Sequence, residues 1–203
     1  APRAVDPLLE RFAPAPPPAN LDIDAWWQDG WAELPWQRNE RDASRRWPLD
    51  VQAAGPLESL EAWLRARGWE TQPQADWRAA LLLLDDDTPP LRQKVLPATL
   101  GASAEALLMR RTLDDGRLVV LRLWRAPRQP RDGTPLWVGT VQTLAHQRPF
   151  DLFALWSPEA DARPAYALLR DDLAGLAQRE DPHPVSGEPV LRLQLPDAPA
   201  TGR

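Results

Sequence analysis

Residues 104–124 read AEALLMRRTLDDGRLVVLRLW, and this stretch decides the fold because it predicts a β-hairpin. Asp115-Gly116 is among the strongest short turn signals for a hairpin, so residues 104–113 and 117–124 are expected to pair. The second strand alternates between two sets, Val119, Leu121 and Leu123 on one face and Leu118, Val120, Arg122 and Trp124 on the other. Because both faces carry apolar residues, this strand is expected in the middle of a sheet.

Further helices and strands are predicted on both sides of the hairpin. Apolar runs predict strands at 47–53, 136–144, 150–156 and 190–195, the last of them at a sheet edge. Helical spacing with start and stop signals predicts helices near 22–31, 56–68, 76–84 and 164–177. This order implies an α+β fold, a single domain whose largely antiparallel sheet has helices packed on one face.

Proline concentrates at both ends of the chain. We expect a Pro-rich linker at 1–20, a globular domain at 21–180, and a Pro-rich tail at 181–203 with a short edge strand at 190–195. Because the chain begins with Ala rather than Met, it is expected to be a processed protein or a part of a longer one.

Composition excludes several classes of function. The net charge is −5 and the isoelectric point is about 5.1, so no basic face and no nucleic-acid partner are expected. No apolar run approaches the roughly 20 residues of a membrane-spanning helix. The chain has no cysteine, which excludes disulfides and thiolate metal ligands.

Patterns for metal binding or catalysis are also missing from the sequence. The two histidines, His146 and His183, are too far apart for the close spacing of a metal site. There is no Gly-x-Ser-x-Gly elbow, no Walker loop and no Gly-x-Gly-x-x-Gly. The sequence therefore predicts no metal site, no cofactor and no catalytic residue.

Tryptophan is unusually frequent, with 11 in the chain. Trp26, Trp27, Trp31 and Trp36 follow the expected linker and border a polar stretch, as in an element that docks on a membrane protein or on a bilayer surface. Core packing explains the same four residues equally well. The sequence therefore leaves both readings open, a binding interface and a core.

A second candidate site combines arginine with tryptophan. Arginine binds phosphate bidentately and stacks on indole, and Arg122 and Arg125 flank Trp124 with Trp137 in the next expected strand. These four residues are candidates for a phosphate-headgroup site. The alternative is that the arginines are ordinary exposed side chains balanced by the 29 acidic residues of the chain.

Several short motifs resemble those of the LssY C-terminal domain family over residues 25–175. They are Gln52-Ala53-Ala54-Gly55-Pro56-Leu57, Gly68-Trp69, Leu121-Arg122-Leu123-Trp124-Arg125 and Leu136-Trp137-Val138-Gly139. In that family the domain often follows a DedA-like module or a type 2 phosphatidic acid phosphatase module in a bacterial membrane protein. The phosphatase motifs, including Pro-Ser-Gly-His, are not present in this chain.

The resemblance implies a non-catalytic accessory, regulatory or interaction domain at the C-terminus of an inner-membrane lipid-phosphatase or lipid-transport protein. Its expected partner is the membrane-embedded module of the same polypeptide, with the membrane surface or a lipid headgroup as further partners. The expected location is at the inner membrane, on the periplasmic side. The alternatives are a module that binds a phosphate headgroup or a small molecule and, third, an independent hydrolase.

Overall fold

A computed structural model describes residues 21–38, 47–73, 94–147 and 155–197. Its main sheet contains β3 (Val51–Ala54), β4 (Glu70–Thr71), β7 (Leu107–Thr112), β8 (Leu118–Arg125), β9 (Leu136–Gln147), β10 (Leu155–Pro158), β11 (Ala177–Pro182) and β12 (Pro189–Gln194). The strand order is β11-β12-β3-β9-β8-β7-β4, and β10 pairs with β9. Two small ribbons pair β1 (Gln37–Arg38) with β2 (Trp47–Pro48), and β5 (Thr99–Leu100) with β6 (Ser103–Ala104).

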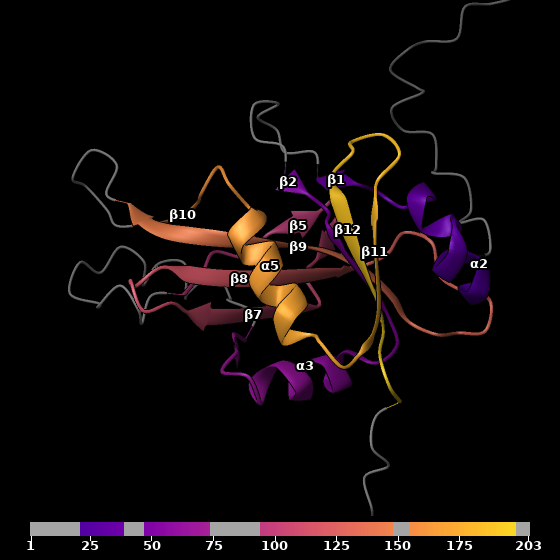
Figure 1. The fold of residues 1–203 in the computed structure, drawn as a ribbon, viewed down its shortest axis with the longest axis horizontal. Helices are drawn as coiled ribbons and strands as arrows, with labels where there is room; N and C mark the ends of the chain where they lie inside the picture. The colour runs from indigo at the N-terminus through magenta and orange to yellow at the C-terminus, as the bar shows by residue number, and fades with distance from the viewer. Residues whose placement is uncertain (1–20, 39–46, 74–93, 148–154, 198–203) are drawn as a thin grey trace, which may run out of the picture.

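The sheet is antiparallel except where β12 runs parallel to β3. β8 lies between β7, with which it pairs over residues 118–123, and β9, with which it pairs along its whole length, as its apolar faces predicted (Figure 1). The expected α+β fold, a single domain with a largely antiparallel sheet, is therefore confirmed.

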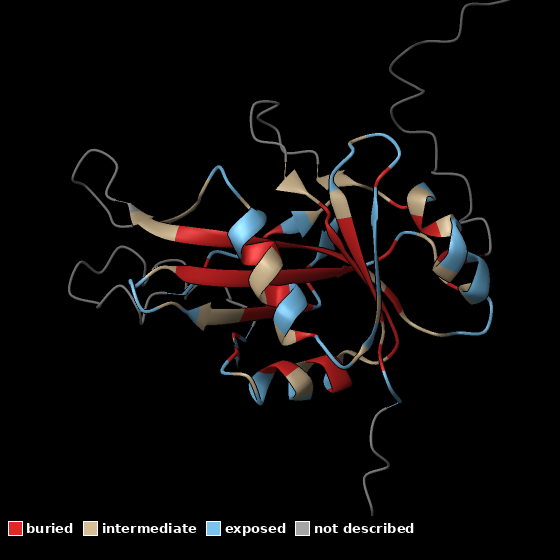
Figure 2. Ribbon diagram, in the orientation of Figure 1, coloured by how far each residue is buried: buried red, intermediate tan, exposed pale blue. Residues whose placement is uncertain are grey.

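One face of the sheet, here called the helical face, is covered by α3 (Leu57–Arg65) and α5 (Arg163–Asp172). Leu60 and Leu64 of α3 and Leu169 of α5 are buried in one apolar core with the strands, as Figure 2 shows by the buried inner sides of both helices. α3 ends before Gly68, whose φ of +84° suits glycine, and the chain then turns back so that Trp69 joins this core.

The opposite face, here called the tryptophan face, is covered by α2 (Ile23–Gln28) and by the 3-10 helix η1 (Gly30–Glu33). Asp22 caps α2, since its carboxylate accepts the N–H groups of Asp24 and Ala25 at 2.9 and 3.1 Å. Trp26 and Trp31 from these short helices pack against Trp124. Helices thus cover both faces of the sheet. The two longer helices, α3 and α5, lie together on one face, as expected.

The C-terminal segment differs from the expected tail. The helix predicted over 164–177 ends at Asp172, and Ala177 instead begins β11 after a turn at Gly175 with φ of +104°. β12 lies between β11 and β3, so it is an interior strand and not the expected edge strand. Residues 181–197 therefore belong to the fold. Of the strand expected at 150–156, residues 150–154 lie outside the described residues, and β10 spans Leu155–Pro158. The helix expected near 76–84 also lies outside the described residues.

The long strand β9 has an interrupted outer edge. On the side away from β8, β3 pairs with residues 136–139 and β10 pairs with residues 144–147, which leaves residues 140–143 between them. The single strand predicted at 47–53 is accordingly split into β2 and β3 by Leu49 and Asp50. This interruption creates the site described below.

No helix among the described residues is both long enough and apolar enough to cross a membrane.

Candidate ligand-binding cleft

Asp50 lies at the interruption in the edge of β9. Its Oδ1 accepts the backbone N–H of Val141 at 3.1 Å, and its own carbonyl accepts the N–H of Leu191 at 2.8 Å. Farther along the same edge, the carbonyl of Thr143 accepts the N–H of Glu159 at 2.9 Å. The Asp50 side chain thus takes the place of a neighbouring strand at one point of this edge of β9. β3 and β10 pair with β9 on either side of that point.

A cleft of about 1010 Å³ opens at this point. It is bounded by the β1–β2 ribbon, by the end of β10 with the start of α5, and by the turn between β11 and β12. Its polar and aromatic lining residues are Trp36, Gln37, Trp47, Asp50, Gln142, Ser157, Glu159, Asp161, Arg163, Tyr166, Ser186 and Glu188. A volume of this size is enough for a small-molecule ligand.

Asp50 is the most perturbed carboxyl of the cleft. The residue is 6 % exposed, and burial raises its pKa from 3.8 to about 8, although the hydrogen bond from Val141 opposes this rise. The negative charge of Glu188 raises the pKa further. No cation pairs with Asp50 in the described parts of the chain, so the carboxyl holds a proton at neutral pH.

The other charges of the cleft are partly paired. Arg163 forms a two-bond ion pair with Asp161, both bonds at 2.8 Å, and this arginine holds the pKa of Asp161 below its usual range. Glu159 pairs with Arg117 at 2.8 Å. Glu188 forms no ion pair within the described ranges, although its charge raises the pKa of the nearby Arg163, so the described lining holds more carboxyl groups than guanidinium groups.

Aromatic rings form much of the remaining wall. Trp36 and Trp47 are half-buried and come from the tryptophan face, while Tyr166 comes from α5 on the helical face. The Tyr166 hydroxyl donates to the Glu180 carboxylate at 3.2 Å, and burial raises the pKa of this phenol. His183 is buried behind Trp36, with its ring centroid 5.8 Å from that indole.

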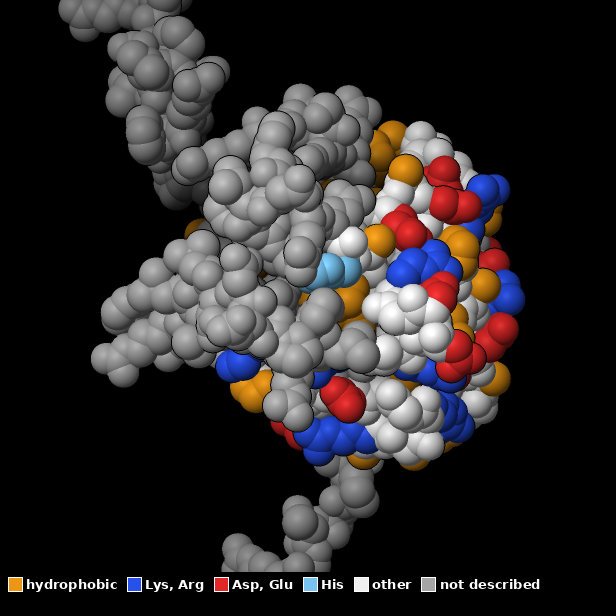
Figure 3. Space-filling view, turned by 90° about the vertical axis from the view of Figure 1, so that its left-hand side faces the viewer, with side chains coloured by type: hydrophobic (Ala, Val, Ile, Leu, Met, Phe, Trp, Pro, Cys, Tyr) orange, Lys and Arg blue, Asp and Glu red, His pale blue; other side chains and the backbone are white. Residues whose placement is uncertain are grey.

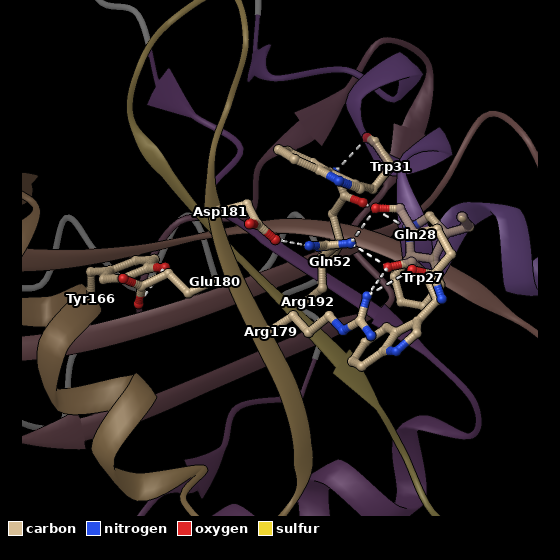
Figure 4. A network of polar contacts seen from close by, with 10 residues as sticks. Trp27, Gln28, Trp31, Gln52, Tyr166, Arg179, Glu180, Asp181 and Arg192 are labelled. Carbon is tan, nitrogen blue, oxygen red and sulfur yellow. Dashed lines mark hydrogen bonds and ion pairs between the residues drawn. The ribbon is translucent and has the colours of Figure 1, made fainter.

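The four tryptophans of the candidate interface separate into two pairs. Trp26 and Trp31 are buried in the core, and the Trp26 indole donates to Gln52 Oε1 at 2.8 Å. Trp27 and Trp36 are half-buried. Trp27 stacks with Arg179 and Arg192, as Figure 4 shows, whereas Trp36 lines the cleft.

The described surface holds few exposed large hydrophobic side chains. They are Leu96 and Val185, and no tryptophan is among them. On the face shown in Figure 3, acidic and basic side chains are interspersed with small orange areas. In the described residues, the tryptophan-rich segment therefore packs mainly inward.

The four residues of the candidate headgroup site lie on different faces. Arg122 is buried on the tryptophan face, where it pairs with Glu105 at 2.7 Å and donates to the Leu96 carbonyl at 2.9 Å. Trp124 is buried on the same face. Trp137 packs on the helical face with its indole bonded to the Gly55 carbonyl at 2.8 Å, and Arg125 opposite it is exposed. The structure therefore does not bring the four together.

The sequence reasoning did not single out Asp50, Tyr166 or Glu188. A signal for Asp50 exists, because an aspartate inside the apolar run Trp-Pro-Leu-Asp-Val interrupts a predicted strand. Glu188 and Tyr166 carry no comparable signal, since Glu188 reaches the cleft through the pairing of β12 with β3 and Tyr166 through the packing of α5 on the sheet. In the part of the chain that the structure describes, no group of three His, Cys, Asp or Glu residues is arranged to hold a metal ion.

A glycine of the sequence motifs has a direct structural role. Gly139 on β9 lies so close to β8 that a Cβ atom there would be 2.1 Å from the Arg122 carbonyl oxygen. Any larger residue would force β8 and β9 apart, next to the point where β3 ends its pairing with β9. The motif Leu136-Trp137-Val138-Gly139 thus fixes the strands that border the cleft.

Comparison with known proteins agrees with these motifs. Comparisons with curated proteins and with solved structures gave no match. A family described as the LssY C-terminus matches residues 31–148, which contain the β1–β2 side of the cleft but not α5 or β12. Since the match covers more than half of the 203 residues, the chain belongs to the LssY C-terminus family.

Proposed function

We propose that this domain is a non-catalytic accessory module that binds a small molecule in the cleft beside Asp50. The observation that carries the proposal is the buried Asp50 carboxyl, which lines a cavity of about 1010 Å³ and has no ionic partner among the described residues. A buried polar group of this kind is costly for the fold, and such groups concentrate at functional sites.

The proposed setting is the C-terminal end of an inner-membrane lipid-phosphatase or lipid-transport protein, on the periplasmic side. This setting is supported by the family resemblance, which implies a membrane-embedded module in the same polypeptide. In this setting the cleft is where the domain senses or holds a ligand for the rest of the protein.

The residues of the cleft favour binding over catalysis. Ser157 and Ser186 both line it, but the described lining contains no histidine or lysine that would activate a serine. Of the other carboxyl groups in the described lining, Glu159 and Asp161 are held in ion pairs with arginines, which leaves Asp50 and Glu188 as the groups that could transfer a proton. We therefore place the chemistry of the full protein outside this domain.

Indole signals provide a test of binding, because Trp36 and Trp47 line the cleft. The 203-residue protein is labelled with ¹⁵N-tryptophan, and tetramethylammonium chloride, glycerol 3-phosphate and glycerol are added in turn. A ligand site predicts that at least one probe shifts both signals in a saturable way. The signal of Trp63, whose indole donates to the Asp172 carbonyl on the helical face, should stay in place.

Two matched variants locate the response. Ala160→Trp adds bulk inside the cleft and should remove the shifts, whereas Ala177→Trp on β11, outside the cleft, should keep them. Shifts that survive Ala160→Trp, or no shift with any probe, would contradict the binding role. Hydrolysis of a lipid phosphate by the 203-residue protein would contradict the non-catalytic role.

A further inference from the structure

The charge of the cleft indicates the class of its ligand. Its described lining contains the carboxyl groups of Asp50, Glu159, Asp161 and Glu188 and the single guanidinium of Arg163. Arg163 is occupied by Asp161, and Glu159 is occupied by Arg117 from outside the lining. The charge without an ion pair of its own is therefore that of Glu188, and the charge of Asp50 is added when this carboxyl loses its proton.

These two carboxyls lie close to one another because of the strand pairing. β12 begins at Pro189, directly after Glu188, and the Leu191 N–H donates to the Asp50 carbonyl at 2.8 Å. Glu188 is near enough for its charge to raise the pKa of Asp50. Two neighbouring carboxyls without an ion pair of their own make a site that a positive charge would stabilise.

The aromatic wall suits the same kind of ligand. Indole rings attract cations through the negative face of their π system, and aromatic walls are a common means of binding quaternary ammonium groups. Trp47 already interacts in this way, since the Arg38 guanidinium carbon lies 4.5 Å from its ring centroid. Trp36, Trp47 and Tyr166 can thus surround the apolar part of a cationic ligand.

We propose that the cleft binds an ammonium group, primary or quaternary, between Asp50 and Glu188, with its carbon atoms against Trp36 and Trp47. This inference rests on the proposed binding function and gives that function a ligand class. A ligand that presents a phosphate to the same point is disfavoured, because it would meet two carboxyl groups and no free cation among the described lining residues.

Binding is coupled to the loss of a proton from Asp50. A positive charge beside this carboxyl favours its ionised form, whereas burial alone keeps it protonated. The other titratable or charged groups that line the cleft, from the end of β10, from α5 and from the β11–β12 turn, are Glu159, Asp161, Arg163, Tyr166 and Glu188. An ammonium ligand should therefore bind more tightly as the pH rises from 6 to 8.

Calorimetric titration tests this coupling. The 203-residue protein is titrated with tetramethylammonium chloride and with choline chloride at pH 6 and at pH 8, at constant ionic strength. We expect saturable binding whose affinity increases about tenfold or more between the two pH values, because the ionised fraction of Asp50 rises. Repeating the pH 6 titration in two buffers of different ionisation enthalpy should reveal release of a proton.

Three variants assign the effect to the carboxyls. Glu188→Gln should weaken binding about tenfold through the loss of one charge. Asp50→Asn keeps an acceptor for the Val141 N–H, and it should both weaken binding and remove the dependence on pH. Glu58→Gln, on the exposed side of α3 and outside the cleft, should bind like the parent protein.

Vesicles distinguish a lipid headgroup from a soluble amine. Co-sedimentation with phosphatidylcholine vesicles that choline displaces would support the inference and assign the ammonium group to a lipid. Binding of the free cations without sedimentation would support it with a soluble ligand. If the indole signals of Trp36 and Trp47 respond to glycerol 3-phosphate but not to tetramethylammonium, the proposal of an ammonium ligand is overturned and the proposed binding function stands. A cleft that responds to none of the probes would overturn both.

Discussion

Arg192 and Asp50 are both ionisable residues buried beside β3, but their surroundings differ. Arg192 on β12 is 1 % exposed, and it donates to the Asp181 carboxylate and to the carbonyls of Trp27 and Gln28 (Figure 4). The Trp31 ring centroid lies 4.7 Å from its guanidinium carbon. The Asp50 carboxyl accepts a hydrogen bond from the Val141 N–H, and it forms no ion pair with the described residues.

The difference separates a structural polar network from a candidate site. The network around Arg192 binds α2 and η1 to the sheet, because the two terminal nitrogens of the guanidinium donate to groups of the protein itself, although its buried Nε has no hydrogen-bond partner. The carboxyl of Asp50 is left with unused hydrogen-bonding capacity at a cavity. Substitutions in the network around Arg192 should therefore change the stability of the protein, whereas substitutions at the cleft beside Asp50 should change ligand binding.

The largest effect on stability is expected for Trp26→Ala. Trp26 is fully buried on the tryptophan face, so its removal leaves a cavity and an unpaired Gln52 Oε1, at a cost of about 3–5 kcal/mol in the free energy of unfolding. Trp36→Ala on the cleft side should cost less, about 1–2 kcal/mol, while it abolishes the response to ligands. Urea denaturation measures both. Equal losses would show that the two tryptophans do not play different roles.

Arg192→Met is expected to destabilise the protein by about 2–4 kcal/mol, since the carbonyls of Trp27 and Gln28 and the Asp181 carboxylate lose the hydrogen bonds that this buried guanidinium donates. Arg179→Met provides the matched control. Arg179 contacts the same Trp27 and Gln28 but is exposed, so its loss should cost less than about 1 kcal/mol. Denaturant midpoints that are the same for both variants would contradict the structural role of Arg192.

A smaller effect, with a distinct dependence on pH, is expected at Asp50. Its pKa in the folded protein, about 8, lies above the value of 3.8 expected for the unfolded chain, so the stabilising contribution is complete below about pH 4 and is lost as the pH rises to about 8. The unfolding free energy should fall by at most about 1.4 kcal/mol per pH unit between pH 6 and pH 7. In Asp50→Asn this slope should disappear, while the exposed Asp24→Asn should retain it. A parent protein with no slope in this range would argue against a protonated Asp50.

The sequence predicted those parts of the fold that depend on local signals. The turn at Asp115-Gly116 and the alternation of β8 were sufficient for the central hairpin, and Gly68 was sufficient for the end of α3. The split between β2 and β3 was not predicted, because both halves have strand-like composition and only Asp50 marks the break. β11 was missed because its residues, Ala-Gln-Arg-Glu-Asp-Pro, are mostly exposed and show no apolar alternation.

The candidate site was harder to predict than the fold. Its groups come from β1, β2, β10, α5 and the turn before β12, which are far apart in the chain. The pairing of β12 with β3, the pairing of β10 with β9 and the packing of α5 on the sheet bring them together. Trp36 alone was singled out from the sequence. Arg122 and Arg125 were candidates for a phosphate-headgroup site because arginine binds phosphate. Arg122 instead forms an ion pair with Glu105 inside the fold, and the sequence contains no signal for this pairing.

The central claim is that Asp50 is a buried carboxyl with a role in binding cations. A ¹³C NMR titration of the Asp50 side-chain carbon, with and without tetramethylammonium, tests it most directly. Without the cation the titration midpoint should lie near pH 8, and saturation with the cation should move it to lower pH. A midpoint near pH 4 that the cation leaves unchanged would contradict the account.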